Sequence, residues 1–182
     1  GFGMPDEPYR IVSQYMHDMY DNEDYLGSFY QPDQDYARGV ICHDLREGFL
    51  ALLGMMMSRD DEWARKTAYE MVRTLDKVTD ENGHLSNKVA REAGLDDRLK
   101  GAGNDATTSG RLVGPLVMYY QFSGDELALD LAGRFAWAAI ESTFTKDGSF
   151  KPCAESGGHI HSITSTLAGL TRYAIYAKDQ AM

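Results

Sequence analysis

A chain of 182 residues is long enough for one domain with a hydrophobic core, and its 43% hydrophobic and 25% charged residues are typical of a folded globular protein. The formal net charge of −10 argues against binding to nucleic acid or to an anionic membrane surface, because both need clustered Lys and Arg. No apolar run reaches the roughly 18 residues that a membrane-spanning helix needs. The first residues lack the basic and apolar regions of a signal peptide, so the compartment stays open and a cytoplasmic location is the default expectation.

Apolar residues recur at three- and four-residue steps along most of the chain, which predicts helices; no alternating pattern long enough for a strand is present. Segment 112–120 is apolar on every side, so we expect a helix enclosed by others. Pro115 inside it is expected to kink that helix or to open one hydrogen bond. A short hairpin near 143–152 is the alternative for that stretch, and the charged segment 88–100 is expected to form a short solvated helix or a lid. The predicted helices are 6–20, 41–58, 61–79, 107–122, 125–144 and 159–177.

An internal repeat is visible in the turns. A glycine, any residue and a large apolar residue recur after three helical stretches, and such a glycine suits the left-handed end of a helix. A short polar turn followed by an acidic residue also recurs, and it joins predicted helices in pairs. The long loops all precede the first helix of a pair, so in a stacked array they emerge on one rim. The glycine turns are Gly27-Ser28-Phe29, Gly83-His84-Leu85 and Gly148-Ser149-Phe150, and the polar turns are 58–64, 121–128 and 176–181.

This pattern resembles the six-hairpin α/α toroid superfamily. The likeness is carried by the three glycine turns, the Ser-Gly-Asp-Glu-Leu-Ala turn at 123–128 and the segment 157–170. The superfamily includes glycosidases, such as unsaturated glucuronyl hydrolases and the β-L-arabinofuranosidase group, and the same toroid occurs in polysaccharide lyases. The resemblance implies an all-α fold of α-hairpin repeats. About two and a half hairpins are present, so we expect residues 1–182 to form a single partial domain, about half of an α/α toroid. Either it is a piece of a longer chain, or a second copy completes it as a homodimer.

Acidic side chains on the rim are the first catalytic candidates. Glycoside cleavage commonly uses two carboxylates on either side of the scissile bond. Asp105 and Glu47 are the foremost candidates, and Asp35 is a third. Each has a structural alternative, because an acid in the first turn of a helix also caps it.

The pair His159 and His161 follows two glycines and is a candidate for proton transfer or for hydrogen bonds to a ligand. We place His161 with the catalytic candidates. A polar helix start is the structural alternative. The arginines at 46 and 111 have the same separation as the second and third glycine turns, and are expected to hold a uronate carboxylate or to pair with nearby acids. The predicted substrate-binding residues are Arg46, Arg111, Tyr36, His159, Asn104 and Glu155.

No metal or cofactor is expected. A zinc site built from Cys42, His43 and Cys153 is the alternative, although the sequence has no Cys-x-x-Cys spacing. Free thiols are preferred over a disulfide for the two cysteines.

The expected function is that of a carbohydrate-active hydrolase that cleaves glycosidic bonds in oligosaccharides, including uronate-containing ones, by carboxylate acid/base catalysis. A non-catalytic helical scaffold that binds a glycan or a protein is one alternative, and a polysaccharide lyase is another. Two rim carboxylates across an open cleft would favour hydrolysis, whereas rim acids paired with arginines would favour a scaffold.

Overall fold

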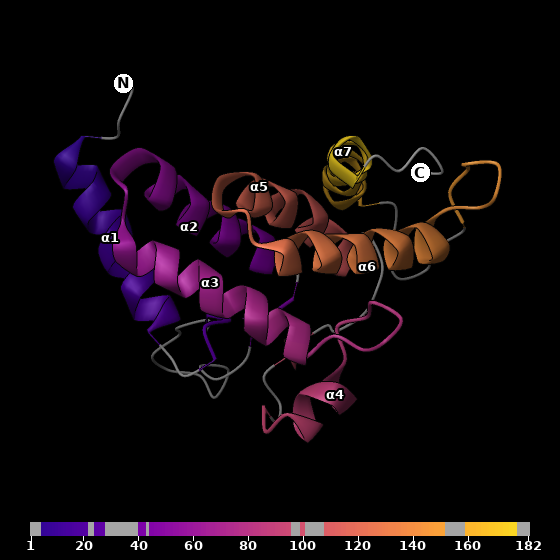
Figure 1. The fold of residues 1–182 in the computed structure, drawn as a ribbon, viewed down its shortest axis with the longest axis horizontal. Helices are drawn as coiled ribbons and strands as arrows, with labels where there is room; N and C mark the ends of the chain where they lie inside the picture. Colours follow the sequence, from indigo (N-terminus) through magenta and orange to yellow (C-terminus); the bar gives the residue numbers. More distant parts are fainter. Residues whose placement is uncertain are drawn as a thin grey trace.

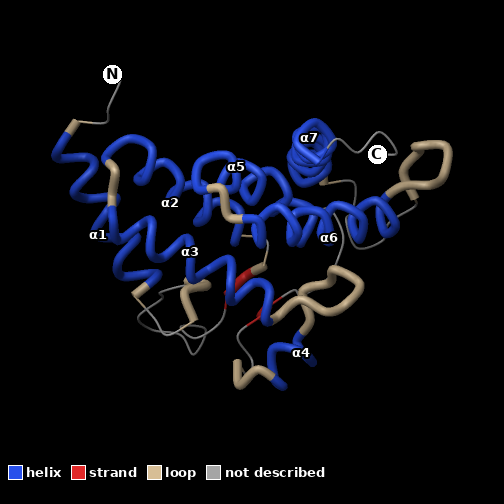
Figure 2. Tube along the Cα trace, viewed as in Figure 1, coloured by secondary structure: helices blue, strands red, loops and turns tan. Residues whose placement is uncertain are grey.

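The computed structural model describes residues 5–21, 24–27, 40–42, 44–95, 99–100, 108–151 and 159–177. These residues are mostly helical, which confirms the all-α character (Figures 1 and 2). None of the described helices is long and apolar enough to cross a membrane. In chain order the elements are α1 (Asp6–Tyr20), β1 (Val40–Ile41), α2 (Leu45–Arg59), α3 (Glu62–Lys77), α4 (Asn87–Glu92), β2 (Leu99–Lys100), the 3₁₀ turn η2 (Ser109–Leu112), α5 (Val113–Ser123), α6 (Glu126–Thr143) and α7 (Ile160–Ala177).

The long helices lie in two rows. We call α2, α5 and α7 the front row and α1, α3 and α6 the back row; the names do not refer to depth in Figure 1, where α2 and α5 lie above and behind α3 and α6 and α7 is seen end-on. Within the front row, α5 packs against both α2 and α7, and in the back row α6 packs against α3. The front row is held together by apolar packing, in which the rings of Phe49 and Tyr119 lie 5.6 Å apart between α2 and α5. Back-row and front-row helices alternate along the chain.

The two complete hairpins, α2–α3 and α5–α6, share the same turn chemistry. Asp60 ends α2 and Gly124 ends α5, both in the left-handed conformation, with φ of 55° and 73°. The next residue, Asp61 or Asp125, caps the following helix by accepting a backbone N–H bond on its carboxylate. Aligning these two caps therefore shows which residue of one hairpin is equivalent to which residue of the next.

The loops that follow α3 and α6 also match each other. Each is closed by one antiparallel bridge, Thr79 to Leu85 in the first and Phe144 to Phe150 in the second. Equivalent backbone bonds recur in both loops, for example from Gly83 N–H to a carbonyl at 3.1 Å and from Gly148 N–H at 2.9 Å. The two glycines have φ of 77° and 82° but lie beyond the helix ends, inside these turns. The predicted glycine turns with left-handed backbone are therefore confirmed, but the helices end at the cap residues Val78 and Phe144 and not at the glycines. The alternative hairpin near 143–152 is reduced to a single bridge.

Two other predictions about helices need correction. Helix α2 begins at Leu45 rather than at 41, because Val40–Ile41 pairs in parallel with Leu99–Lys100. The helix predicted from 107 begins as the 3₁₀ turn η2 and becomes α-helical only at Val113, which puts Pro115 in the first α-helical turn. A proline is tolerated there because the first N–H groups of a helix have no intrahelical partner. The enclosure of α5 is confirmed along its first turns, where most side chains are buried.

Small residues allow α7 to approach its neighbours closely. Gly169 of α7 faces Gly114 of α5, and a Cβ added to Gly169 would lie 2.7 Å from the Gly114 nitrogen. Gly133 of α6 leaves room for the ring of Tyr173, whose Cζ would lie 2.9 Å from an added Cβ. These contacts fix α7 against α5 and α6, and thereby fix the side chains at its N-terminal end.

Candidate functional site

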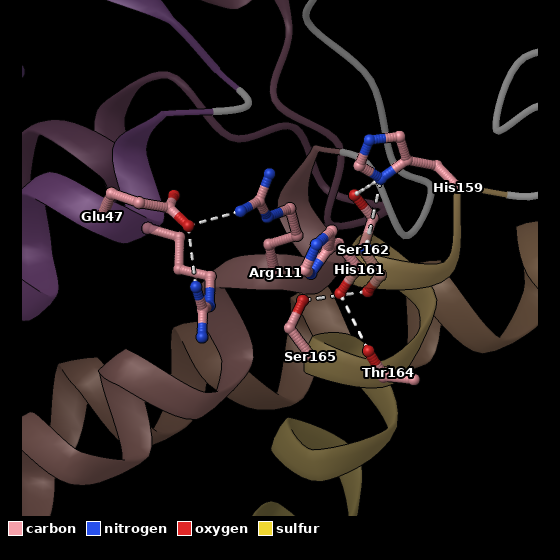
Figure 3. Close-up of polar contacts among 8 residues, drawn as sticks. Glu47, Arg111, His159, His161, Ser162, Thr164 and Ser165 are labelled. Carbon is pink, nitrogen blue, oxygen red and sulfur yellow. Dashed lines mark hydrogen bonds and ion pairs between the residues drawn. The ribbon is translucent and has the colours of Figure 1, made fainter.

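The N-terminal ends of the three front-row helices line one polar pocket of about 590 Å³ (Figure 3). The starts of these elements lie beside one another at the pocket, although α7 crosses the direction of α2 and α5 and is seen end-on in Figure 1. The first turn of α2, the 3₁₀ turn before α5 and the start of α7 each contribute side chains. The lining residues are Arg46, Glu47, Arg111, His159, His161, Thr164 and Ser165.

Two arginines share one carboxylate in this pocket. The Arg111 guanidinium lies 2.5 Å from Glu47 Oε1, and Arg46 Nη1 lies 2.7 Å from the same oxygen. The Arg111 side chain is only 6% exposed, whereas that of Glu47 is 50% exposed. A buried guanidinium is thus held at the pocket wall by a carboxylate that remains open to solvent.

When the two hairpins are aligned by their helix caps, the residues that correspond to each other differ from those predicted from the glycine turns. Glu47 and Arg111 have the same separation in the sequence as the caps Asp61 and Asp125. The predicted correspondence between Arg46 and Arg111 is therefore off by one position. Equivalent positions on α2 and before α5 hold opposite charges and form an ion pair with each other.

The histidines stand at the start of α7. His159 Nδ1 accepts the backbone N–H of Ser162 at 3.4 Å and lies 3.0 Å from the buried Ser162 hydroxyl. In the neutral form of His159 the ring proton is consequently on Nε2. The ring centroids of His159 and His161 lie 6.1 Å apart, and both residues line the pocket.

The electrostatic character of the pocket favours an anion. The N-terminal ends of α2 and α7 bring their partial positive charge to the pocket, and the 3₁₀ turn before α5 contributes Arg111. Arg46 and Arg111 add two full positive charges, against the single negative charge of Glu47 among the described lining residues. Hydroxyl groups of Thr164 and Ser165 supply neutral hydrogen-bonding groups beside them.

All of the predicted site residues that the structure describes come together here, from three separate helices: Arg46, Glu47, Arg111, His159 and His161. The remaining predicted site residues lie outside the described residues: Asp35, Tyr36, Asn104, Asp105 and Glu155. Sequence reasoning missed Thr164 and Ser165. Their positions three and four residues after His161, on the same face of a helix, were the signal that could have found them.

The suggested zinc ligands are only partly described. Cys42 is a buried free thiol, and burial raises its pKa to about 12, so that the thiolate a metal needs is unfavourable. His43 and Cys153 lie outside the described residues. Within the described parts of the chain, no three His, Cys, Asp or Glu side chains gather to form a metal site.

Comparison with protein-family models and with curated proteins finds no match for this sequence.

Proposed function

We propose that the described helices form the site-bearing part of an α/α-toroid carbohydrate-active enzyme that hydrolyses glycosidic bonds in uronate-containing oligosaccharides. The observation that carries this proposal is the meeting of two guanidinium groups with the N-terminal ends of α2 and α7 in one polar pocket. Such a pocket favours a ligand that has both a carboxylate and hydroxyl groups. An acidic sugar has both.

In this proposal the arginines bind the acidic group of the sugar. Guanidinium groups recognise carboxylates through paired N–H bonds, and Arg111 is held in place by its burial. In the structure, the Glu47 carboxylate lies between the guanidinium groups of Arg46 and Arg111 and contacts both. A uronate carboxylate would bind at the outer N–H groups, with Glu47 fixing the orientation of both guanidiniums.

Hydrolysis requires a proton donor and a base. Glu47 is the carboxylate that lines the pocket in the described part of the chain, and His161 is the histidine we assign to proton transfer. The second carboxylate is proposed to come from Asp105 or Asp35. This assignment rests on the sequence alone, since both residues lie outside the described ranges.

The proposal is tested by product analysis. The protein would be incubated with uronate-containing oligosaccharides, and the products analysed by mass spectrometry. Addition of one water per cleaved bond is expected, together with loss of turnover in Glu47→Gln. Glu62→Gln is the matched control, because Glu62 occupies the first turn of the back-row helix α3. Equal turnover in wild type and Glu47→Gln would rule out the role given to Glu47.

A binding scaffold without catalysis is the second candidate, and one observation favours it. The described carboxylate of the pocket is engaged by two arginines rather than standing alone across a cleft. Tight binding of the oligosaccharide without any product would support this candidate and would contradict hydrolysis. A lyase would instead release a product with a new conjugated double bond, visible as ultraviolet absorbance and without added water.

A further inference from the structure

Two hydroxyl groups of α7 line the polar pocket, and each donates its proton to the backbone of its own helix. Thr164 Oγ1 donates to the carbonyls of Ile160 and His161, at 2.8 and 3.2 Å. Ser165 Oγ donates to the Ser162 carbonyl at 3.0 Å (Figure 3). A hydroxyl has one proton to donate and two lone pairs that accept. Both oxygens therefore act toward the pocket as hydrogen-bond acceptors.

The opposite chemistry comes from α2 and from the 3₁₀ turn η2. Arg46 and Arg111 line the same pocket, and a guanidinium group has N–H donors but no acceptor. We call these two arginines the donor side of the pocket, and Thr164 and Ser165 its acceptor side. A ligand that satisfies both sides carries acceptor atoms at one end and a donor group at the other.

This arrangement distinguishes two classes of anion. A sulfate ion has acceptor oxygens and no proton at neutral pH, so it can bind the arginines but meets only lone pairs at the acceptor side. Turning either hydroxyl toward the ion would break its bond to the helix backbone. A sugar acid has a carboxylate for the donor side and hydroxyl groups that donate to the acceptor side. The pocket therefore favours a hydroxylated carboxylate over a bare anion.

Ser165 is the more selective of the two acceptors. It is partly buried, whereas Thr164 is exposed, so water replaces a missing ligand hydroxyl more readily at Thr164. An acceptor that loses access to water and finds no donor on the ligand weakens binding. A site built to pair with a ligand hydroxyl discriminates strongly against the analogue that lacks it.

We propose that Ser165, assisted by Thr164, is a specificity-determining residue that accepts a hydrogen bond from a ring hydroxyl of the acidic sugar. The sugar then lies with its carboxylate at the donor side and that hydroxyl at α7. This inference rests on the proposed function, because it takes the acidic sugar as the ligand. It adds the residues that distinguish this sugar from its deoxy analogues and from inorganic anions.

Calorimetric titration of the full chain with galacturonate and its 2-, 3- and 4-deoxy analogues tests the role of Ser165. For wild type, one analogue is expected to bind at least about tenfold more weakly than galacturonate, because it leaves Ser165 unpaired. In Ser165→Ala this difference should shrink to within about twofold. Sulfate, the probe that cannot donate, should bind equally to both proteins. Alanine suits a helix, so circular dichroism of Ser165→Ala should match wild type.

Thr171→Val is the matched control for Thr164→Val. Thr171 is also exposed on α7 and donates to a backbone carbonyl, that of Leu167 at 2.9 Å, but it is not among the described residues that line the pocket. Thr164→Val should reduce the preference for galacturonate, and Thr171→Val should leave it unchanged.

Two results would overturn the inference while the proposed function stands. One is equal binding of galacturonate and every deoxy analogue by wild type. The other is a preference for galacturonate that Ser165→Ala leaves intact. A wild-type protein that binds no galacturonate would overturn both the inference and the proposed function.

Discussion

Gly169→Ala is expected to destabilise the protein through the contact between α7 and α5. The added Cβ would lie 2.7 Å from the backbone nitrogen of Gly114 and 3.1 Å from the Val113 Cβ. Backbone cannot rotate away as a side chain can, so the helices must separate. Overpacking of this kind costs about 1–3 kcal/mol, and alanine returns up to about 1 kcal/mol of helix propensity. The free energy of unfolding should therefore fall by up to about 2 kcal/mol.

Gly54→Ala is the matched control for this experiment. Gly54 also lies inside a front-row helix, but an added Cβ there meets nothing within 4 Å. That variant should gain about 0.5–1 kcal/mol from helix propensity alone. Urea unfolding followed by circular dichroism measures both changes. If Gly169→Ala is stabilised as much as Gly54→Ala, the close crossing of α5 and α7 is refuted, and so is the position it gives to the pocket histidines.

Three further results are expected. Asp60→Gly should raise the free energy of unfolding by about 0.5–1 kcal/mol, since φ at Asp60 is 55° and glycine adopts this conformation without strain; thermal unfolding checks it. Hydrogen bonds, above all from Ser149, lower the pKa of Asp147 to about 2. The stabilisation they give the turn is complete above the ordinary pKa and is lost as pH falls through 2, so Ser149→Ala should move the NMR titration of Asp147 upward; an unchanged titration would contradict this. In a double-mutant cycle, Glu47→Gln and Arg111→Met should show a coupling of about 1 kcal/mol that decreases at high salt, and additive effects would argue against the ion pair.

Much of the helix pattern could be predicted from the sequence, for local reasons. The apolar spacing of α3 and α6 and the polar turns before them identified the helices within one or two residues. The acid after each turn caps its helix, as the repeat indicated. The long loops all precede the first helix of a hairpin, and this pattern predicted that the residues beside them would meet at one rim. Arg46, Glu47 and the two histidines do line one pocket.

The errors arose where tertiary contacts override local preference. Nothing near Val40–Ile41 in the sequence indicates that it pairs with the distant Leu99–Lys100 and so delays the start of α2. The change from 3₁₀ to α-helix before Pro115 depends on the packing of η2 against α6 and α7. The spacing between the glycine turns is one residue longer than the spacing between the helix caps, so the glycine turns aligned Arg111 with Arg46 and not with Glu47. The ion pair between Glu47 and Arg111 was therefore visible only in three dimensions.

The central claim is that the rim pocket binds an acidic sugar through its arginines, and calorimetric titration tests it most directly. The protein would be titrated with digalacturonate and, in parallel, with the neutral disaccharide of the same linkage. We predict that the acidic disaccharide binds, that the neutral one binds at least about tenfold more weakly, and that Arg111→Met removes this difference. Equal binding of both sugars, or a preference for the acidic sugar that survives in Arg111→Met, would contradict the account.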